Sequence, residues 1–253
     1  MRLIAEFSSD REFQIPIHYN HYIQGFIYNS ISPKLAQILH DQGFPLEKRK
    51  FKLFTYSRIF GKFNSNDHKG TITFNSPFRL IVSSVMNVFI QEIGEELLRK
   101  ETLRIASNVV SVNSVEVSDF PINEEKIKIK MLSPVTIYST LSSSSGRKKT
   151  YYYNPFEKEF SQLLSENAKK KFKAFYDKES RGEIILIGQN LSNKYEKIIS
   201  YKGTVIKGWM GIYELSGDPE LLKIVYDAGL GGKNPQGFGC FEVLGRKNFR
   251  DED

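Results

Sequence analysis

The sequence contains one cysteine, Cys240, among its 253 residues. A single thiol excludes both an internal disulfide and a zinc site built from cysteines. Cys240 begins a predicted strand, where we expect a small buried apolar residue. The sequence also lacks an obvious cluster of carboxylates and histidines with metal-ligand spacing. It therefore predicts no metal site and no cofactor.

Long apolar runs are absent as well. None approaches the roughly 20 residues that a membrane-spanning helix needs. Residues 1–6, MRLIAE, place an acidic residue where a signal peptide would be apolar. These absences predict a soluble, cytoplasmic protein without a membrane partner.

Acidic residues are outnumbered by basic ones, 29 against 36, which gives a net charge of +7. Three of the acids are the last three residues, 251–253, so the rest of the chain is more basic still. A basic protein favours polyanionic partners. Aromatic residues make up 13% of the chain. Such rings can stack on the bases of single-stranded or looped RNA, although most rings in a globular protein belong to its core.

The glycine-rich stretch 229–239 does not match the common nucleotide-binding motifs. A dinucleotide fingerprint needs a strand before G-x-G-x-x-G and a helix after it. Here a predicted helix over 218–227 precedes the glycines and a predicted strand over 240–244 follows them. A P-loop needs Ser or Thr after Gly-Lys, whereas Asn234 follows Lys233. Two interpretations stay open: the glycines turn amide N–H groups toward an anion, or they only pack a tight connection.

Hydrophobic periodicity predicts the order β-α-α-β-β-α-β over the first half. Asn20 is the predicted N-cap of the first helix, and Ser32-Pro33 begins the second, which ends at Gly43. A linker is predicted over 119–123. The predicted helices cover 21–30, 33–43 and 85–103, and the predicted strands cover 2–8, 50–57, 71–83, 109–112 and 115–117.

The second half repeats this pattern. A predicted hairpin has its tip at 142–146, and a long predicted helix over 157–176 ends in a lysine-rich run. The predicted strands cover 126–131, 135–140, 147–153, 183–187, 195–200 and 204–213. We therefore predict an α+β protein of two tandem ferredoxin-like (RRM-like) domains with antiparallel sheets, over 1–119 and 124–246, with a charged tail over 247–253.

Three polar side chains of the first half are candidates for acid–base chemistry. Tyr28 and His40 lie on consecutive predicted helices, each about 140° from the apolar stripe at roughly 100° per residue. Lys52 lies on the predicted strand that follows. These residues also have an ordinary explanation, because a histidine near a helix C-terminus interacts favourably with the helix dipole.

The glycine-rich stretch resembles the C-terminal loop of the repeat-associated RNA-binding (RAMP) superfamily of CRISPR systems. That loop reads G-h-G-x(5)-G-h-G, where h is apolar and one of the x residues is basic. Here two Gly-apolar-Gly units flank five residues that include Lys233. The resemblance implies RNA contacts from Gly229, Gly231, Lys233, Gly237 and Gly239.

The chain as a whole is similar to one member of that superfamily, the CRISPR-associated endoribonuclease that cuts precursor crRNA within its repeats. The likeness rests on the segments 17–31, 39–40, 52–57, 132–134 and 154–160. Archaeal relatives use a Tyr, a His and a Lys, and the resemblance carries these roles to Tyr28, His40 and Lys52. His18 and His21 are alternative histidines, which we expect to be structural or to contact RNA.

The implied chemistry suits these residue types. Attack of an RNA 2′-hydroxyl on its own phosphate needs a base, an acid for the departing 5′-oxygen and a cation for the phosphorane charge. We assign His40 as the base, Tyr28 as the acid or an orienting group, and Lys52 as the charge stabiliser, with the roles of His40 and Tyr28 open to exchange. This chemistry requires no metal.

Two basic runs, Lys48-Arg49-Lys50 and Arg147-Lys148-Lys149, are expected to contact RNA. The implied partner is CRISPR repeat RNA in precursor crRNA, and other subunits of a crRNA effector complex or a second copy of the chain are further candidate partners. Two other functions remain open: a non-cleaving RNA-binding subunit of the same superfamily, and a structural, ribosome-like RNA-binding protein. An assay for cleavage of repeat RNA separates them from the endoribonuclease.

Overall fold

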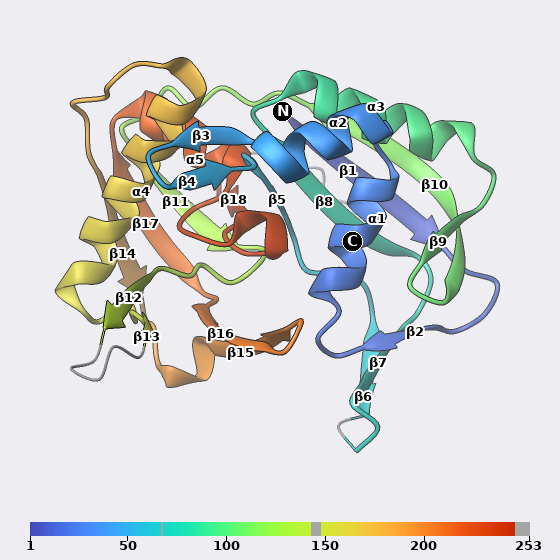
Figure 1. Cartoon of the computed structure of the whole chain (residues 1–253). Coiled ribbons are helices and arrows are strands. Elements are labelled where there is room, and N and C mark those ends of the chain that lie inside the picture. The colour runs from blue at the N-terminus through green and yellow to red at the C-terminus, as the bar shows by residue number, and fades with distance from the viewer. Residues whose placement is uncertain (67, 143–147, 246–253) are drawn as a thin grey trace.

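The computed structural model of the chain describes residues 1–66, 68–142 and 148–245 (Figure 1). Most of the predicted hairpin tip, Arg147 and the predicted charged tail lie outside the described residues. The two halves lie side by side, the first coloured blue to green and the second yellow to red (Figure 1). In these described ranges, no helix is both long and apolar enough to cross a membrane.

The first half is built on a five-stranded antiparallel sheet with the order β5-β8-β1-β10-β9. Strands β5, β8, β1 and β10 are the second, third, first and fourth strands of a β-α-β-β-α-β unit, which is the ferredoxin-like arrangement. The main elements are β1 (Arg2–Ser8), α1 (Asn20–Asn29), β5 (Phe54–Tyr56), β8 (Phe78–Ser84), α3 (Asn87–Arg99), β9 (Leu103–Ile105) and β10 (Asn108–Ser118).

The second half has the same topology in a four-stranded antiparallel sheet, with the order β14-β17-β11-β18. Its main elements are β11 (Lys126–Met131), α4 (Lys158–Tyr176), β14 (Ile184–Gln189), β17 (Ile212–Gly217), α5 (Pro219–Ala228) and β18 (Phe241–Val243). The prediction of two tandem ferredoxin-like folds is confirmed.

Shorter elements extend the connections between these strands. The helical ones are α2 (Pro33–Gln37), the π-helical turn η1 (Ile38–Gln42), and the 3-10 turns η2 (Asn193–Tyr195) and η3 (Asn234–Gln236). The strands of the small sheets are β2 (Phe13–Pro16), β6 (Phe63–Asn66) and β7 (Thr71–Phe74), then the pairs β3 (Phe44–Leu46) with β4 (Arg49–Phe51), β12 (Tyr138–Ser142) with β13 (Lys148–Tyr152), and β15 (Glu196–Tyr201) with β16 (Thr204–Trp209).

The β3–β4 hairpin belongs to the first half but lies over the second (Figure 1). Its Phe44 ring packs against Phe175 of α4, with 5.6 Å between the ring centroids. The hairpin therefore bridges the two halves.

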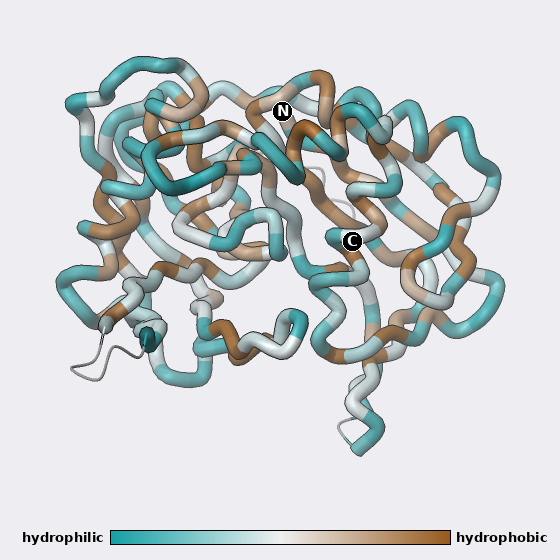
Figure 2. Tube along the Cα trace, in the orientation of Figure 1, coloured by the Kyte–Doolittle hydropathy of each residue, from teal (hydrophilic) through white to brown (hydrophobic). Residues whose placement is uncertain are grey.

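Each half has its own hydrophobic core. In β11 the alternation KIKIKM buries Ile127, Ile129 and Met131 on one face of the sheet and exposes the lysines between them. In α4 the four-residue spacing of Phe160, Leu164 and Ala168 turns these residues toward the sheet. Figure 2 shows hydrophobic segments along the strands and hydrophilic segments along many outer loops.

Three predicted strands are interrupted. The strand predicted over 50–57 breaks at Leu53, which has a positive φ of 50°, and the strand over 204–213 breaks before Ile212. The strand over 71–83 divides into β7 and β8, whereas the short strands predicted over 109–112 and 115–117 are one strand, β10. The bounds differ because alternating hydrophobic residues indicate which face of a segment is buried, but not where its backbone hydrogen bonds to neighbouring strands are interrupted.

The predicted helix starts have different outcomes. Ser32 caps α2 as predicted, since its side chain accepts a hydrogen bond from the Leu35 amide at 3.3 Å. Asn20 is not an N-cap: Tyr19 occupies that position, and Asn20 is the first residue of α1. The Asn20 amide instead donates to the Gln236 carbonyl at 2.7 Å. The side chain that the local pattern predicted as a helix cap thus binds a residue 216 positions away in the chain.

Candidate nucleic-acid interface

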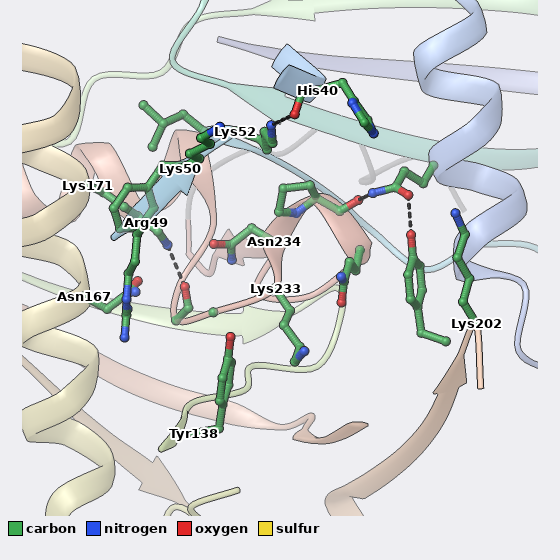
Figure 3. A pocket seen from close by; sticks show the side chains of 18 of the residues that line it. His40, Arg49, Lys50, Lys52, Tyr138, Asn167, Lys171, Lys202, Lys233 and Asn234 are labelled. Carbon is green, nitrogen blue, oxygen red and sulfur yellow. Dashed lines mark hydrogen bonds between the residues drawn. The ribbon is translucent and has the colours of Figure 1, made fainter. Parts of the chain in front are cut away.

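A cavity of about 1240 Å³ lies between the two halves, lined by α1, the β3–β4 hairpin, α4 and the glycine-rich stretch (Figure 3). Its lining includes eight basic residues: Lys48, Arg49, Lys50, Lys52, Lys148, Lys171, Lys202 and Lys233. Among the described residues that line it, none is Asp or Glu. Because these charges are all positive, the lining creates a positive potential that suits a polyanion.

The cavity brings together the three candidates for acid–base chemistry, Tyr28, His40 and Lys52. They come from α1, η1 and the segment between β4 and β5. His21 lines the same cavity, whereas His18 lines a separate hollow of about 260 Å³.

Tyr28 lies on the last turn of α1 and is half-buried, with its ring edge-on to Phe54 at 5.9 Å between centroids. Burial, with a smaller contribution from Tyr201, raises the pKa of Tyr28 to about 12. The phenol therefore keeps its proton at neutral pH. It is suited to donate a proton or to orient a substrate group rather than to act as a base.

His40 lies on η1 and presents its ring to solvent, with 81% of the side chain exposed. Its Nδ1 is 2.8 Å from Oδ1 of Asp41. The hydrogen bond from His40 lowers the pKa of the Asp41 carboxyl, which therefore stays ionised. A proton on Nδ1 that is donated to this carboxylate leaves Nε2 as the proton acceptor.

Lys52 binds the π-helical turn that carries His40. Its Nζ donates to the His40 carbonyl at 2.6 Å and to the Leu39 carbonyl. An ammonium has three N–H donors, so one remains for a further acceptor such as a phosphate oxygen. Burial and the neighbouring charge of Lys50 lower the pKa of Lys52.

Only some residues of the two basic runs predicted to contact RNA line the cavity. Lys48, Arg49 and Lys50 are exposed on the β3–β4 hairpin and line the cavity, as does Lys148 of β13. Lys149 is exposed but does not line it. Arg147 lies outside the described residues.

The glycine-rich stretch contributes its middle to the cavity and buries its ends. Gly231, Lys233 and the residues of η3 line the cavity, whereas Gly229, Gly237 and Gly239 are buried away from it. At Gly237, where φ is +83°, an added Cβ would lie 2.6 Å from the Asn20 amide and from the Tyr56 ring. Close packing thus accounts for glycine at this position.

Lys233 adopts a left-handed backbone conformation that presents its side chain to the cavity (Figure 3). Its Nζ is 4.8 Å from the centroid of the Tyr138 ring, a cation–π contact. Burial lowers the pKa of Lys233.

Sequence reasoning did not identify Lys171, which belongs to the lysine-rich run of α4. Lys171 is fully buried, and its Nζ donates to the Gly231 carbonyl at 2.7 Å and to the Gly229 carbonyl. Burial lowers its pKa to about 7. Its burial could have been predicted from the sequence, because the seven-residue spacing from Leu164 places Lys171 on the inward face of the helix.

Other polar residues of the lining were also missed. They are Gln24, Tyr138, Asn167, Tyr201 and Lys202. In the part of the chain that the structure describes, no group of three or more His, Cys, Asp or Glu side chains is arranged to hold a metal ion.

Comparison with known families gives two matches that together span most of the chain. The C-terminal model of "CRISPR associated protein Cas6" matches residues 114–243, and the N-terminal model of "CRISPR-associated protein Cas6" matches residues 14–116.

Curated relatives include the CRISPR-associated endoribonuclease Cas6 1 of Methanocaldococcus jannaschii, which is 28% identical over 260 residues and covers 100% of this chain and 96% of the relative. The CRISPR-associated endoribonuclease Cas6 of Pyrococcus furiosus is 26% identical over 259 residues, covering 100% of this chain and 92% of the relative.

Solved structures show the same fold. One described as "CRISPR associated protein Cas6" has a TM-score of 0.78 at 26% identity, covering 96% of this chain and 99% of the other. Another, described as "An RAMP protein binding different RNA substrates", has a TM-score of 0.80 at 17% identity with the same coverage.

Proposed function

Because this chain belongs to the Cas6 family of CRISPR-associated proteins, we propose that it is an endoribonuclease that cuts CRISPR repeat RNA in precursor crRNA. The observation that carries the proposal is the cavity between the two halves. It combines a phenol, an imidazole and an ammonium with a basic lining that, over the described residues, contains no carboxylate. Its chemistry suits both binding an RNA backbone and transferring protons at a phosphate.

The proposed reaction uses the substrate's own nucleophile. The 2′-hydroxyl attacks the adjacent phosphorus, the bond to the 5′-oxygen breaks, and the products carry a 2′,3′-cyclic phosphate and a 5′-hydroxyl. Nε2 of His40 accepts the proton of the 2′-hydroxyl. Tyr28 donates a proton to the departing 5′-oxygen or orients the phosphate, a role that its raised pKa supports. The free N–H of Lys52 stabilises the charge on the phosphorane.

Binding is assigned to the basic residues around this centre. Lys48, Arg49, Lys50 and Lys148 offer phosphate contacts. Lys233 and its loop contribute from the second half. The same proposal treats residues 1–119 and 124–246 as the two domains that hold the RNA between them.

The remaining parts of the proposal concern context. The protein acts in the cytoplasm on newly transcribed precursor crRNA. Other effector-complex subunits, or a second copy of the chain, then receive or share the product.

Incubation of the purified protein with repeat RNA in EDTA tests the activity. We expect one cut per repeat, with cyclic phosphate and 5′-hydroxyl ends. An RNA with a single 2′-deoxy substitution at the cut site should bind within a few-fold of the normal RNA and remain whole. Cleavage of the deoxy RNA, or a strict requirement for magnesium, would contradict the mechanism.

A further inference from the structure

Three side chains of α1 recur every four residues along the helix: Asn20, Gln24 and Tyr28. Residues four apart lie on neighbouring turns of one helix face. The first two bind the glycine-rich stretch, and the third is the proposed catalytic phenol. One face of one helix thus meets both the loop of the second half and the chemistry of the first.

The two amides bind successive carbonyls of the loop. Nε2 of Gln24 donates to the Pro235 carbonyl at 2.6 Å. Nδ2 of Asn20 donates to the Gln236 carbonyl at 2.7 Å and to the Gly237 carbonyl at 3.3 Å. The segment directly after Lys233 is therefore tied to α1.

Each amide is held with its nitrogen toward the loop. Oδ1 of Asn20 accepts a hydrogen bond from Arg58 at 3.1 Å. Oε1 of Gln24 accepts one from the Tyr201 hydroxyl. Because the oxygens are occupied by donors, the nitrogens are left to face the carbonyls.

Several hydrogen bonds hold the loop from within the second half. Asn234 closes it internally by donating to the Leu230 and Phe238 carbonyls at 3.1 and 3.0 Å. Lys171 holds the Gly231 carbonyl from within the second half. The bonds from α1 place the loop relative to the first half, together with Thr55 of β5, whose Oγ1 donates to the Phe238 carbonyl at 2.8 Å.

We propose that Gln24 and Asn20 are positioning residues that fix the glycine-rich loop relative to Tyr28, so that RNA bound along the loop presents its scissile phosphate to Tyr28. The inference rests on the proposed function. The inference adds to that function that the contact between the halves affects the rate of cleavage rather than the affinity for RNA. A misplacement of about 1 Å at a reacting centre can cost roughly 10²-fold in rate.

Gln24→Met tests the proposal, because it keeps the length of the side chain and removes both hydrogen bonds. At saturating enzyme we expect the single-turnover rate to fall at least about tenfold, while the Kd for repeat RNA stays within about threefold. Gln91→Met is the matched control, since the Gln91 side chain donates to Glu95 at 2.8 Å on the exposed surface of α3. Gln24→Glu refines the test: it keeps the acceptor for Tyr201 and loses the donor for Pro235, so its rate at saturation should match that of Gln24→Met, while its negative charge in the basic cavity should weaken RNA binding.

A double variant separates positioning from a general structural role. If Gln24 acts through Tyr28, Gln24→Met should cost little further rate in a Tyr28→Phe background. Additive losses, or a wild-type rate in Gln24→Met, would overturn the inference. So would a Kd of Gln24→Met that weakens in proportion to the rate. If the wild-type protein cuts no repeat RNA, the proposed function itself is wrong and the inference falls with it.

Discussion

The two halves share one topology but elaborate different connections. In the first half, the path from the first helix to the second strand is long and holds α2, η1 and the β3–β4 hairpin. The equivalent path in the second half, from α4 to β14, spans only residues 177–183. Conversely, the path from the second helix to the fourth strand holds β9 in the first half and the glycine-rich loop in the second.

Elaborated connections from both halves therefore reach the shared cavity. The first half supplies His40 and Lys52 from its connection and Tyr28 from the helix before it, and the second half supplies the loop with Lys233. The comparison shows that a common scaffold places its functional groups through connections rather than through the sheets. It also suggests that the proposed acid–base groups come from the first half alone, whereas RNA contacts come from both halves, which variants can test.

The largest effect is expected from His40→Ala, which removes the proposed base of the first half. Proton transfer by a positioned side chain is typically worth about 10² to 10⁴ in rate. We expect the single-turnover rate to fall at least about a hundredfold, while RNA affinity stays within a few-fold because His40 contributes little phosphate contact. His18→Ala is the control, since His18 lines a different hollow. An active His40→Ala enzyme would move the search for the base to His21.

The second prediction concerns the buried ammonium under the loop. The pKa of Lys171 is about 7 in the folded protein against an ordinary value of 10.5. Between these values the unfolded chain binds more protons than the folded one, so this group makes stability rise as pH increases from about 7 toward 10.5. The slope is at most about 1.4 kcal/mol per pH unit.

Melting temperatures from pH 6 to 9 check this prediction. The wild-type protein should gain stability relative to Lys171→Met as the pH rises, and the neighbouring variant Lys170→Met should follow the wild type. Parallel curves for wild type and Lys171→Met would show that Lys171 does not titrate in this range.

The third prediction tests the contribution of the second half to RNA binding. Lys233→Ala should weaken RNA binding several-fold and leave the rate at saturation nearly unchanged. Because one phosphate contact is lost, the slope of log Kd against log salt should fall by about 0.7 for a single strand. Lys149→Ala serves as the comparison, since that lysine is exposed outside the cavity. A wild-type salt slope in Lys233→Ala would mean that the loop serves packing alone.

The topology could be predicted from the sequence, because the periodicity of residues such as Ile127 and Leu164 indicates locally which face is buried. The bridging hairpin could not, because its Phe44 packs on a helix more than 100 residues away. Asn20 was misjudged for the same reason, and the spacing of Lys171 from Leu164 indicates that Lys171 is buried but not what it binds. The side chains of Asn20 and Lys171 satisfy carbonyls of the glycine-rich loop, and no local pattern records that partner.

The smallest expected effect is at Gly25, in the middle of α1. It is exposed to the cavity, and an added Cβ would meet nothing within 4 Å. Glycine inside a helix costs roughly 0.5 to 1 kcal/mol relative to alanine, so Gly25→Ala should raise the free energy of unfolding by about that amount. No contact within the described protein requires glycine here, which leaves room for RNA to lie against this turn of α1.

Gly25→Leu sharpens the comparison between the halves. Its larger side chain should keep the fold, as judged by melting temperature, and obstruct RNA that passes along α1. Weaker binding in Gly25→Leu with undiminished stability would show that α1 contacts the bound RNA, in addition to the β3–β4 hairpin. A wild-type Kd would place the RNA path away from this turn, because a side chain projecting into an occupied path cannot leave affinity unchanged.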